Sequence, residues 1–244
     1  MAITIGAGIT IGGGIGVSGD VVALEAAPTT LAQEYGGGYY FGTIDYSGGS
    51  GTQKYYLVVA PKSTQTSLAW GLGDSIPNSF VDGYSNTYAV PNTASYPAAQ
   101  YARGLSTGGF TDWYVPSYYE MDMLLTNLKS YNVNNNYTAV TDGITIGVNP
   151  YSVPAGTGWT TTVPAWSANT AFRGPSGAQS FNGDNIASPQ WWTSTQRLGQ
   201  FTMHNFIGVF SAQLNVPSTY GLFGTQFKTD AKNVRCIRRV AYYA

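Results

Sequence analysis

The strongest hydrophobic pattern in the chain follows residue 116. Four apolar residues recur there at the i, i+3, i+4, i+7 spacing of one helical face: Met121, Leu124, Leu125 and Leu128. Ser117 and Glu120 precede this face with the S-x-x-E spacing of a capping box, in which each side chain bonds the backbone N–H of the other residue. The pattern predicts a helix from Ser117 to about Tyr131, and we expect Trp113 to pack beneath it.

A second helix is predicted earlier in the chain by the same spacing. Its apolar positions are Ala98, Tyr101, Ala102 and Leu105. Ser95 is a candidate N-cap, because its hydroxyl can accept a hydrogen bond from a free backbone N–H of the first turn. Residues 72–93 have no such periodicity and are predicted to be loop.

Apolar runs bounded by glycine predict strands on both sides of the helices. Residues 39–45 and 55–61 form two such runs around the turn residues 47–51, which predicts a β-hairpin. The second run is almost continuously apolar, which indicates a central, buried strand. Trp70 and Gly71 close this unit.

Three more strands are predicted in the second half of the chain, at residues 190–195, 206–210 and 234–240. Alternation along the last strand assigns its side chains to two faces, with Val234, Cys236 and Arg238 on one and Arg235, Ile237 and Arg239 on the other. Two helices between β-hairpin elements, with the first and last strands adjacent, indicate an α+β fold.

Two regions do not fit this simple pattern. Residues 132–189 form a long insert rich in Thr, Asn, Gly and Pro, and loops of this length in a compact domain are often functional. The insert either binds a ligand or covers a neighbouring chain. Residues 3–8, 9–14 and 15–19 form a short repeat of I-T-I strand residues and glycines.

The repeat is too short to bury its own apolar face. We therefore expect residues 1–19 to pair with copies of themselves, giving a homo-oligomer, or with another protein. A flexible leader is the alternative. Residues 143–148 repeat the pattern and are a candidate pairing partner. With residues 20–33 as a linker or short helix, we divide the chain into an N-terminal assembly segment, 1–30, and one domain, 31–244.

Composition changes this picture in one respect. Only 9% of the 244 residues are charged, against a usual ~25%, while 31 Gly, 19 Tyr and 6 Trp are present. Such a composition is typical of β-structure with long polar loops, and a surface with few charges suits a chain inside a large assembly. The net charge of −1 and the scattered basic residues argue against nucleic-acid binding.

The cysteine count and the lack of recognisable targeting segments bear on where the protein is made. The single cysteine, Cys236, cannot form an internal disulfide. No basic region followed by an apolar stretch opens the chain, and no apolar run approaches the ~20 residues of a membrane span. We therefore expect the protein to be made and assembled in a cytoplasm.

Four motifs in fixed order resemble those of one known family. They are G-G before residues 39–41 with L-V-V-A-P at 57–61 and W-G at 70–71, G-F-T-D-W-Y-V-P-S-x-x-E at 109–120, W-T-S-T at 192–195 and V-R-C-I-R at 234–238. This pattern resembles a domain of unknown function typified by the C-terminal domain of collagen-like adhesins, over about residues 35–240. The long insert and the N-terminal repeat depart from that pattern.

The resemblance implies a C-type-lectin-like fold, with two helices packed on small antiparallel sheets and long loops. That fold is similar to those of formylglycine-generating enzymes and phage receptor-binding proteins. The resemblance assigns structural roles to six motif residues: Asp112, Trp113, Ser117, Glu120, Trp192 and Arg235. The N-terminal repeat, in turn, is similar to leaders of virion structural proteins of tailed phages.

The candidate catalytic residues are few. Formylglycine-generating chemistry uses a cysteine pair, whereas Cys236 is alone and fits core packing. His204 is the only histidine, and no G-x-S-x-G elbow accompanies it. Asp112 and Glu120 fit a turn-fixing group and a helix cap. No metal motif is present, Asp184 with Asn182 and Asn185 is the nearest group for Ca²⁺, and no cofactor is expected.

Binding has better support. The resemblance puts the ligand face at W-T-S-T and the following loops, where residues 196–226 carry amides, hydroxyls and aromatic rings that suit a sugar or a protein epitope. The candidate ligand-binding residues are Gln200, Thr202, His204, Asn205, Tyr220 and Phe223.

These features lead to one functional hypothesis and two alternatives. The protein is predicted to be a non-enzymatic virion component of a tailed phage, a fibre tip or a capsid or tail decoration, that binds a host-surface glycan or protein. The alternatives are a bacterial adhesin-like surface module and an enzyme of the formylglycine-generating type. Mutation of Cys236 to alanine separates the enzyme from the other two.

Overall fold

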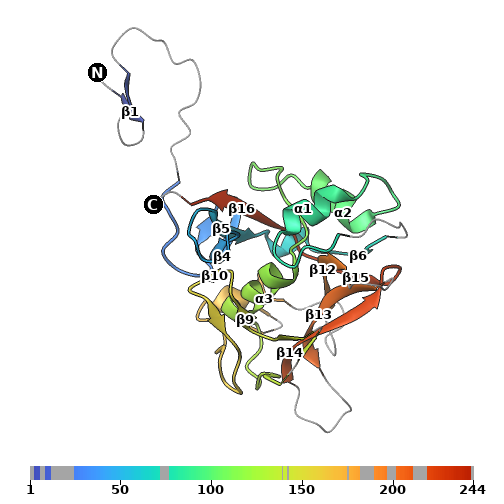
Figure 1. The fold of residues 1–244 in the computed structure, drawn as a ribbon. Helices are drawn as coiled ribbons and strands as arrows, with labels where there is room; N and C mark the ends of the chain where they lie inside the picture. Colours follow the sequence, from blue (N-terminus) through green and yellow to red (C-terminus); the bar gives the residue numbers. More distant parts are fainter. Residues whose placement is uncertain are drawn as a thin grey trace.

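The computed structural model describes most of the chain (Figure 1). Side chains are described for residues 25–71, 77–138, 143–174, 176–181, 190–196 and 227–242, and the backbone alone for residues 3–5, 9–11, 140–141, 202–210 and 219–226. Within these residues the fold is α+β, with three α-helices and mainly antiparallel sheets. The predicted fold class is therefore confirmed at this level.

The first sheet is built on the predicted hairpin. Its order is β10-β4-β5-β16, with β3 added beside β4: β3 (Glu34–Tyr35), β4 (Gly38–Asp45), β5 (Lys54–Val59), β10 (Ser152–Val153) and β16 (Ile237–Ala241). β5 lies between β4 and β16 and pairs antiparallel with both. This central position explains the continuous apolar run of β5, because both of its faces are covered.

The second sheet has the order β14-β13-β12-β15-β6: β6 (Thr66–Ala69), β12 (Gln190–Gln196), β13 (Thr202–Phe210), β14 (Thr219–Phe227) and β15 (Ala231–Val234). β12 and β15 pair in parallel, and the other neighbours are antiparallel. The sequence pattern predicted β12 and part of β13 but neither β6 nor β14.

The last predicted strand, residues 234–240, is in fact two strands in different sheets. β15 ends at Val234 in the second sheet, and β16 begins at Ile237 in the first. The predicted alternation still holds, since Val234 and Cys236 pack in one core cluster and Ile237 in the other. The single-strand prediction was wrong because an apolar pattern does not reveal that a chain changes partners.

Short strand pairs shape the rest of the chain. β1 (Ile3–Ile5) pairs with β2 (Ile9–Ile11), β7 (Val140–Thr141) with β8 (Ile144–Thr145), and β9 (Val148–Asn149) with β11 (Gly156–Thr157). The 143–148 segment therefore pairs locally in the described chain, and not with the N-terminal repeat as the sequence suggested. Two 3₁₀ turns cover Lys62–Thr64 and Thr170–Phe172.

The helices agree with the sequence only in part. α3 (Tyr118–Asn127) has the predicted capping box, although it ends before Tyr131. α2 (Pro97–Gly104) begins after Tyr96 with proline at its first position, so Ser95 is not its N-cap. α1 (Gly83–Ala89) falls in a region predicted to be loop. The sequence pattern did not predict it because it is only two turns long and polar, although its N-cap, Asp82, is a typical helix-start residue.

α3 lies at the centre of the fold, with β4 and β5 on one side and β12 and β13 on the other (Figure 1). Its apolar face, Met121, Leu124, Leu125 and Leu128, is fully buried in the first core cluster. Trp113 instead belongs to the second cluster, with Trp70, Trp192 and the α2 alanines. The expectation that Trp113 packs beneath α3 was wrong, and Tyr114 contributes to the α3 cluster instead.

Candidate functional site

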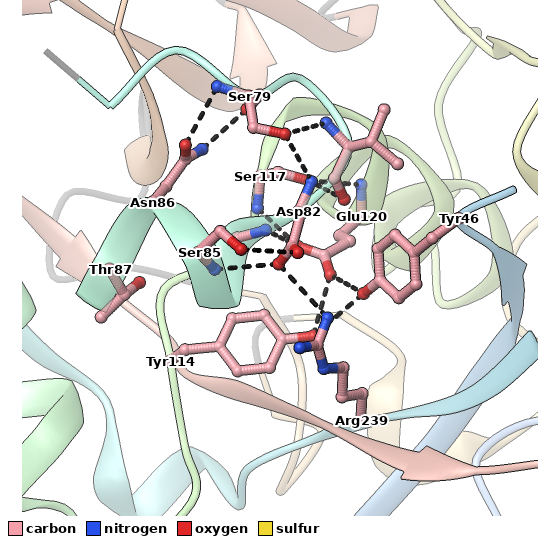
Figure 2. Close-up of polar contacts among 12 residues, drawn as sticks. Tyr46, Ser79, Asp82, Ser85, Asn86, Thr87, Tyr114, Ser117, Glu120 and Arg239 are labelled. Carbon is pink, nitrogen blue, oxygen red and sulfur yellow. Dashed lines mark hydrogen bonds and ion pairs between the residues drawn. The ribbon is translucent and has the colours of Figure 1, made fainter. Parts of the chain in front are cut away.

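The N-terminus of α3 holds a buried polar network around Glu120, whose side chain is fully inaccessible (Figure 2). One carboxylate oxygen accepts from the hydroxyls of Tyr114, at 2.8 Å, and Tyr46. The other accepts from the backbone N–H groups of Ser117, at 2.8 Å, and Gly83, at 3.0 Å. Burial raises the pKa of Glu120, against the opposing effect of the bonds from Ser117, Tyr46 and Tyr114.

Gly83 is required at its position by this contact. A Cβ there would lie 2.5 Å from the nearer Glu120 oxygen, so any side chain would displace the carboxylate. The predicted capping box of Ser117 and Glu120 is confirmed. The Glu120 carboxylate also accepts from the N–H of Gly83, the first residue of α1. Glu120 joins α1 and α3, because Gly83 begins one and Ser117 caps the other.

Arg239 supplies the positive charge beside this network. Its guanidinium lies 3.3 Å from the Asp82 carboxylate and within 5.3 Å of the ring centres of Tyr46, Tyr55 and Tyr84. Asp82 in turn accepts from the backbone of Ser85 in the first turn of α1. Cation–π contacts and one ion pair therefore tie β16 to α1 and to the hairpin. Arg239 is paired with Asp82, and four protein donors bind Glu120. The cluster is therefore arranged to hold the fold together.

The remaining motif residues are also structural. Asp112 forms a two-point ion pair with Arg238, with distances of 2.7 and 3.0 Å. It therefore holds β16 and does not fix the local turn as predicted. The buried Arg235 donates to the carbonyl oxygens of Ala60, at 2.9 Å, and Gln179, at 3.2 Å.

Trp192 and Cys236 fill the second core cluster. The indole N–H of Trp192 donates to the Leu68 carbonyl at 2.8 Å, and both side chains are buried. Burial raises the pKa of the Cys236 thiol to about 12. A thiol held protonated in this way is a poor nucleophile.

The predicted ligand-binding residues remain untested. Gln200 lies outside the described residues, as do Asn182, Asp184 and Asn185 of the candidate calcium group. Thr202, His204 and Asn205 fall on β13, and Tyr220 and Phe223 on β14, where the backbone alone is described.

The register of this strand pair divides the five predicted positions into two sets. Phe206 pairs with Phe223, and Val209 with Tyr220. Thr202, His204 and Phe223 therefore share one set of alternating positions, whereas Asn205 and Tyr220 belong to the other. Successive positions of a strand belong to opposite faces of the sheet, so a ligand on one face would meet only one of these sets.

A groove of about 260 Å³ lies over the other end of α3. Four residues of α3 form its floor: Asp122, Met123, Thr126 and Asn127. Its walls are residues 152–159 of the insert, with Gly147, Asn149 and the Val163-Pro164 turn. Val153 and Val163 are exposed at its rim. The groove combines an apolar rim with a few polar groups, as small-molecule sites do.

Asp122 is the buried charge in this groove. The residue is only 2% exposed, and its one hydrogen bond among the described residues comes from the Gly147 N–H, at 2.9 Å. Burial raises its pKa to about 7. Asp122 is not among the residues predicted from the sequence, although an acid inside the apolar run of residues 121–125 is the signal that could have identified it.

The groove walls are fixed to α3 by hydrogen bonds. The Trp159 indole N–H donates to the Thr126 hydroxyl at 2.9 Å, and the Asn149 amide donates to the Tyr119 carbonyl at 2.9 Å. Gly147 has a φ of +77°, and a Cβ there would lie 2.0 Å from the Trp159 ring. The wall therefore has a defined shape, as a binding site requires.

A second hollow of about 320 Å³ lies beside β3 and β4. It contains two acids, Glu25 and Glu34. Glu25 accepts from the Gly36 N–H at 2.7 Å, and Glu34 bonds the Tyr39 hydroxyl, whose pKa is raised mainly by burial. Because both acids are exposed to solvent, whereas Asp122 is buried, this hollow is the weaker candidate.

In the described part of the chain, no group of three or more His, Cys, Asp or Glu residues is placed to hold a metal ion. None of the described helices has the length and apolar character needed to cross a membrane. Comparison of the chain with protein-family models, with curated proteins and with solved structures found no match.

Proposed function

We propose that this protein is a non-enzymatic binding component of a tailed-phage virion, a fibre tip or a capsid or tail decoration. In this proposal residues 31–244 form a C-type-lectin-like head that binds a host-surface glycan, and residues 1–19 attach the head to itself or to another virion protein. Assembly takes place in the host cytoplasm. Several heads on one particle convert weak single-site binding into useful avidity.

The observation that carries this proposal is the contrast along α3. The Glu120 network is closed, with every carboxylate oxygen occupied by protein donors, whereas the Asp122 groove is open and has an apolar rim. A rigid hollow with few polar groups favours binding over covalent chemistry. The motif resemblance, the I-T-I-G repeat and the low charge supply the virion context.

The experiment is a screen of the full chain on an array of bacterial surface polysaccharides, with light scattering to measure its mass. We expect an oligomer that binds at least one polysaccharide and leaves it chemically unchanged by mass spectrometry. A chain that binds none of them, or that cleaves or modifies one, contradicts the proposal. The bacterial adhesin-like alternative is favoured if the chain binds but is absent from purified phage particles.

Two variants complete the test. Replacing Tyr220 and Phe223 together by alanine examines both faces of the β13–β14 strand pair at once, because the register puts the two positions on opposite faces. Loss of binding with an unchanged melting temperature would place the ligand on this strand pair. A Cys236→Ala variant examines the formylglycine-generating alternative. Under our proposal it binds as the unaltered protein does, because the thiol is a buried packing group.

A further inference from the structure

One oxygen of the Asp122 carboxylate accepts no hydrogen bond from the described residues. Oδ1 accepts from the Gly147 N–H, and the described residues form no further hydrogen bond or ion pair with this side chain. Because the residue lines the groove, the second oxygen is the natural contact for a ligand at its floor. An ionised carboxylate buried with a single donor is unfavourable, so a bound group that completes its coordination would stabilise the ionised form.

The missing partner is a positive charge. Lys129 follows α3, but its ammonium group donates to the Val133 carbonyl at 2.6 Å and to the Asn135 side chain at 2.7 Å. These bonds hold Lys129 within the insert. The described residues that line the groove include no Lys or Arg, so a cation at Asp122 has to come with the ligand. An ammonium group supplies both the charge and the hydrogen-bond donors.

Two polar groups flank this carboxylate. Thr126 stands at i+4 from Asp122, so both lie on one side of the helix. Its hydroxyl oxygen accepts from Trp159 and retains its own proton for donation. Asn127 uses its amide N–H on the Phe41 carbonyl, at 2.7 Å, which leaves its side-chain oxygen as an acceptor. The floor thus fits an amine with neighbouring hydroxyl groups.

We propose that the groove binds an amino sugar of a surface polysaccharide, with its free amino group on Asp122. The neighbouring hydroxyls bond Thr126 and Asn127, and the apolar face of the sugar ring packs against Val153 and Val163 at the rim. The hollow of about 260 Å³ suits a single sugar ring better than a long oligosaccharide. This inference rests on the proposed function, because it names the ligand class of that binding head.

The test compares two tetrasaccharides that differ only in the amino group. The full chain is titrated calorimetrically with the tetramer of glucosamine and with the tetramer of N-acetylglucosamine. We expect the free amine to bind at least about tenfold tighter, because acetylation removes the charge that pairs with Asp122. Asp122→Asn should abolish this preference while keeping an acceptor for the Gly147 N–H.

Asp230→Asn is the matched control, since it removes the same charge from a partly exposed ion pair outside the groove. It should keep the full preference. A second pair of variants avoids the buried core altogether. Val163 is 57% exposed, so Val163→Lys and Val163→Gln should both fold. The lysine should weaken binding of the amine severalfold more than the neutral glutamine does.

The outcomes separate this inference from the proposed function. A chain that binds polysaccharides on the array but does not prefer the free amine overturns the inference and leaves the function standing. The inference also fails if Asp122→Asn keeps the preference, or if Asp230→Asn loses as much affinity, which would indicate non-specific attraction of a cation. A chain that binds neither tetramer and no arrayed polysaccharide contradicts both proposals.

Discussion

Two buried acids stand two residues apart on α3 and have opposite surroundings. Glu120 accepts hydrogen bonds from four donors that come from the residue after β4, from α1 and from the segment before α3. Asp122 accepts from one, the Gly147 N–H of the insert. Burial raises the pKa of both carboxyls. Residues at i and i+2 point to different sides of a helix, so one helix serves two unrelated environments.

The comparison shows that the two acids differ in how many hydrogen bonds the fold gives them. Glu120 lies where separate elements meet, and its hydrogen bonds are used to hold them together. Asp122 lies at the groove beside the insert, and the described residues give its carboxylate one hydrogen bond. A carboxylate that the fold has fully coordinated is structural, and one that it has coordinated in part is a candidate for binding.

The largest expected effect is the loss of the Glu120 network. Glu120→Ala leaves the backbone donors of Gly83 and Ser117 and the hydroxyls of Tyr46 and Tyr114 without their acceptor. We expect the free energy of unfolding to fall by about 4 kcal/mol or more, measured by urea denaturation.

Asp122→Asn is the comparison for that variant. At about pH 4, where the folded chain keeps the Asp122 carboxyl protonated, it should change the free energy of unfolding by less than about 1.5 kcal/mol, because the asparagine oxygen can still accept from Gly147. Equal losses for the two variants would contradict the distinction between a closed network and an open groove.

The next effect concerns the wall of the groove. Gly147→Ala combines a positive φ with a Cβ 2.0 Å from Trp159, so we expect a loss of about 2–3 kcal/mol. Gly143→Ala is the matched control, since Gly143 has a φ of +79° but nothing near its Cβ. It should lose only about 1 kcal/mol. If both variants lose the same amount, the contact with Trp159 does not shape the groove.

The last expected effect is a dependence of stability on pH, which is small for each pH unit. The folded chain keeps the Asp122 proton up to about pH 7, whereas the unfolded chain releases it near the ordinary value of 3.8. The folded state thus binds more protons between these values, and its stability falls as the pH rises through them. Asp122 contributes up to about 1.4 kcal/mol per pH unit, and Glu120 acts in the same direction.

Denaturation at several pH values should therefore show a shallower slope for Asp122→Asn than for the unaltered chain. The residual slope of the variant reports on Glu120 and the other acids. An unchanged slope would mean that Asp122 titrates as it does in the unfolded chain, and that the groove is wetter than the structure indicates.

Local patterns predicted several elements correctly. The S-x-x-E spacing at Ser117 identified the start of α3, because a capping box is a contact between near neighbours in sequence. The continuous apolar run of residues 55–61 identified a buried central strand. The same approach missed α1 and β6, whose residues are too polar for a clear period and are held by contacts with distant parts of the chain.

The candidate site was harder to predict than the fold. The sequence directed attention to residues 196–226, which remain a prediction, and it marked the long insert as functional without naming its residues. The groove forms only when residues 147–164 fold back over α3, more than 20 positions away from Asp122. A local sequence pattern cannot predict a contact between segments so far apart in the chain.

The sequence by itself determined the α+β class, the buried face and cap of α3 and the hairpin, since each depends on periodicity or on residues a few positions apart. Only the tertiary structure decided that the last strand divides between two sheets and that Trp113 packs away from α3. It also decided that Glu120 has four hydrogen-bond donors around it, whereas Asp122 has one among the described residues. The physical reason is that the state of a buried charge depends on which donors surround it in space, and those donors come from elements that are distant in the chain.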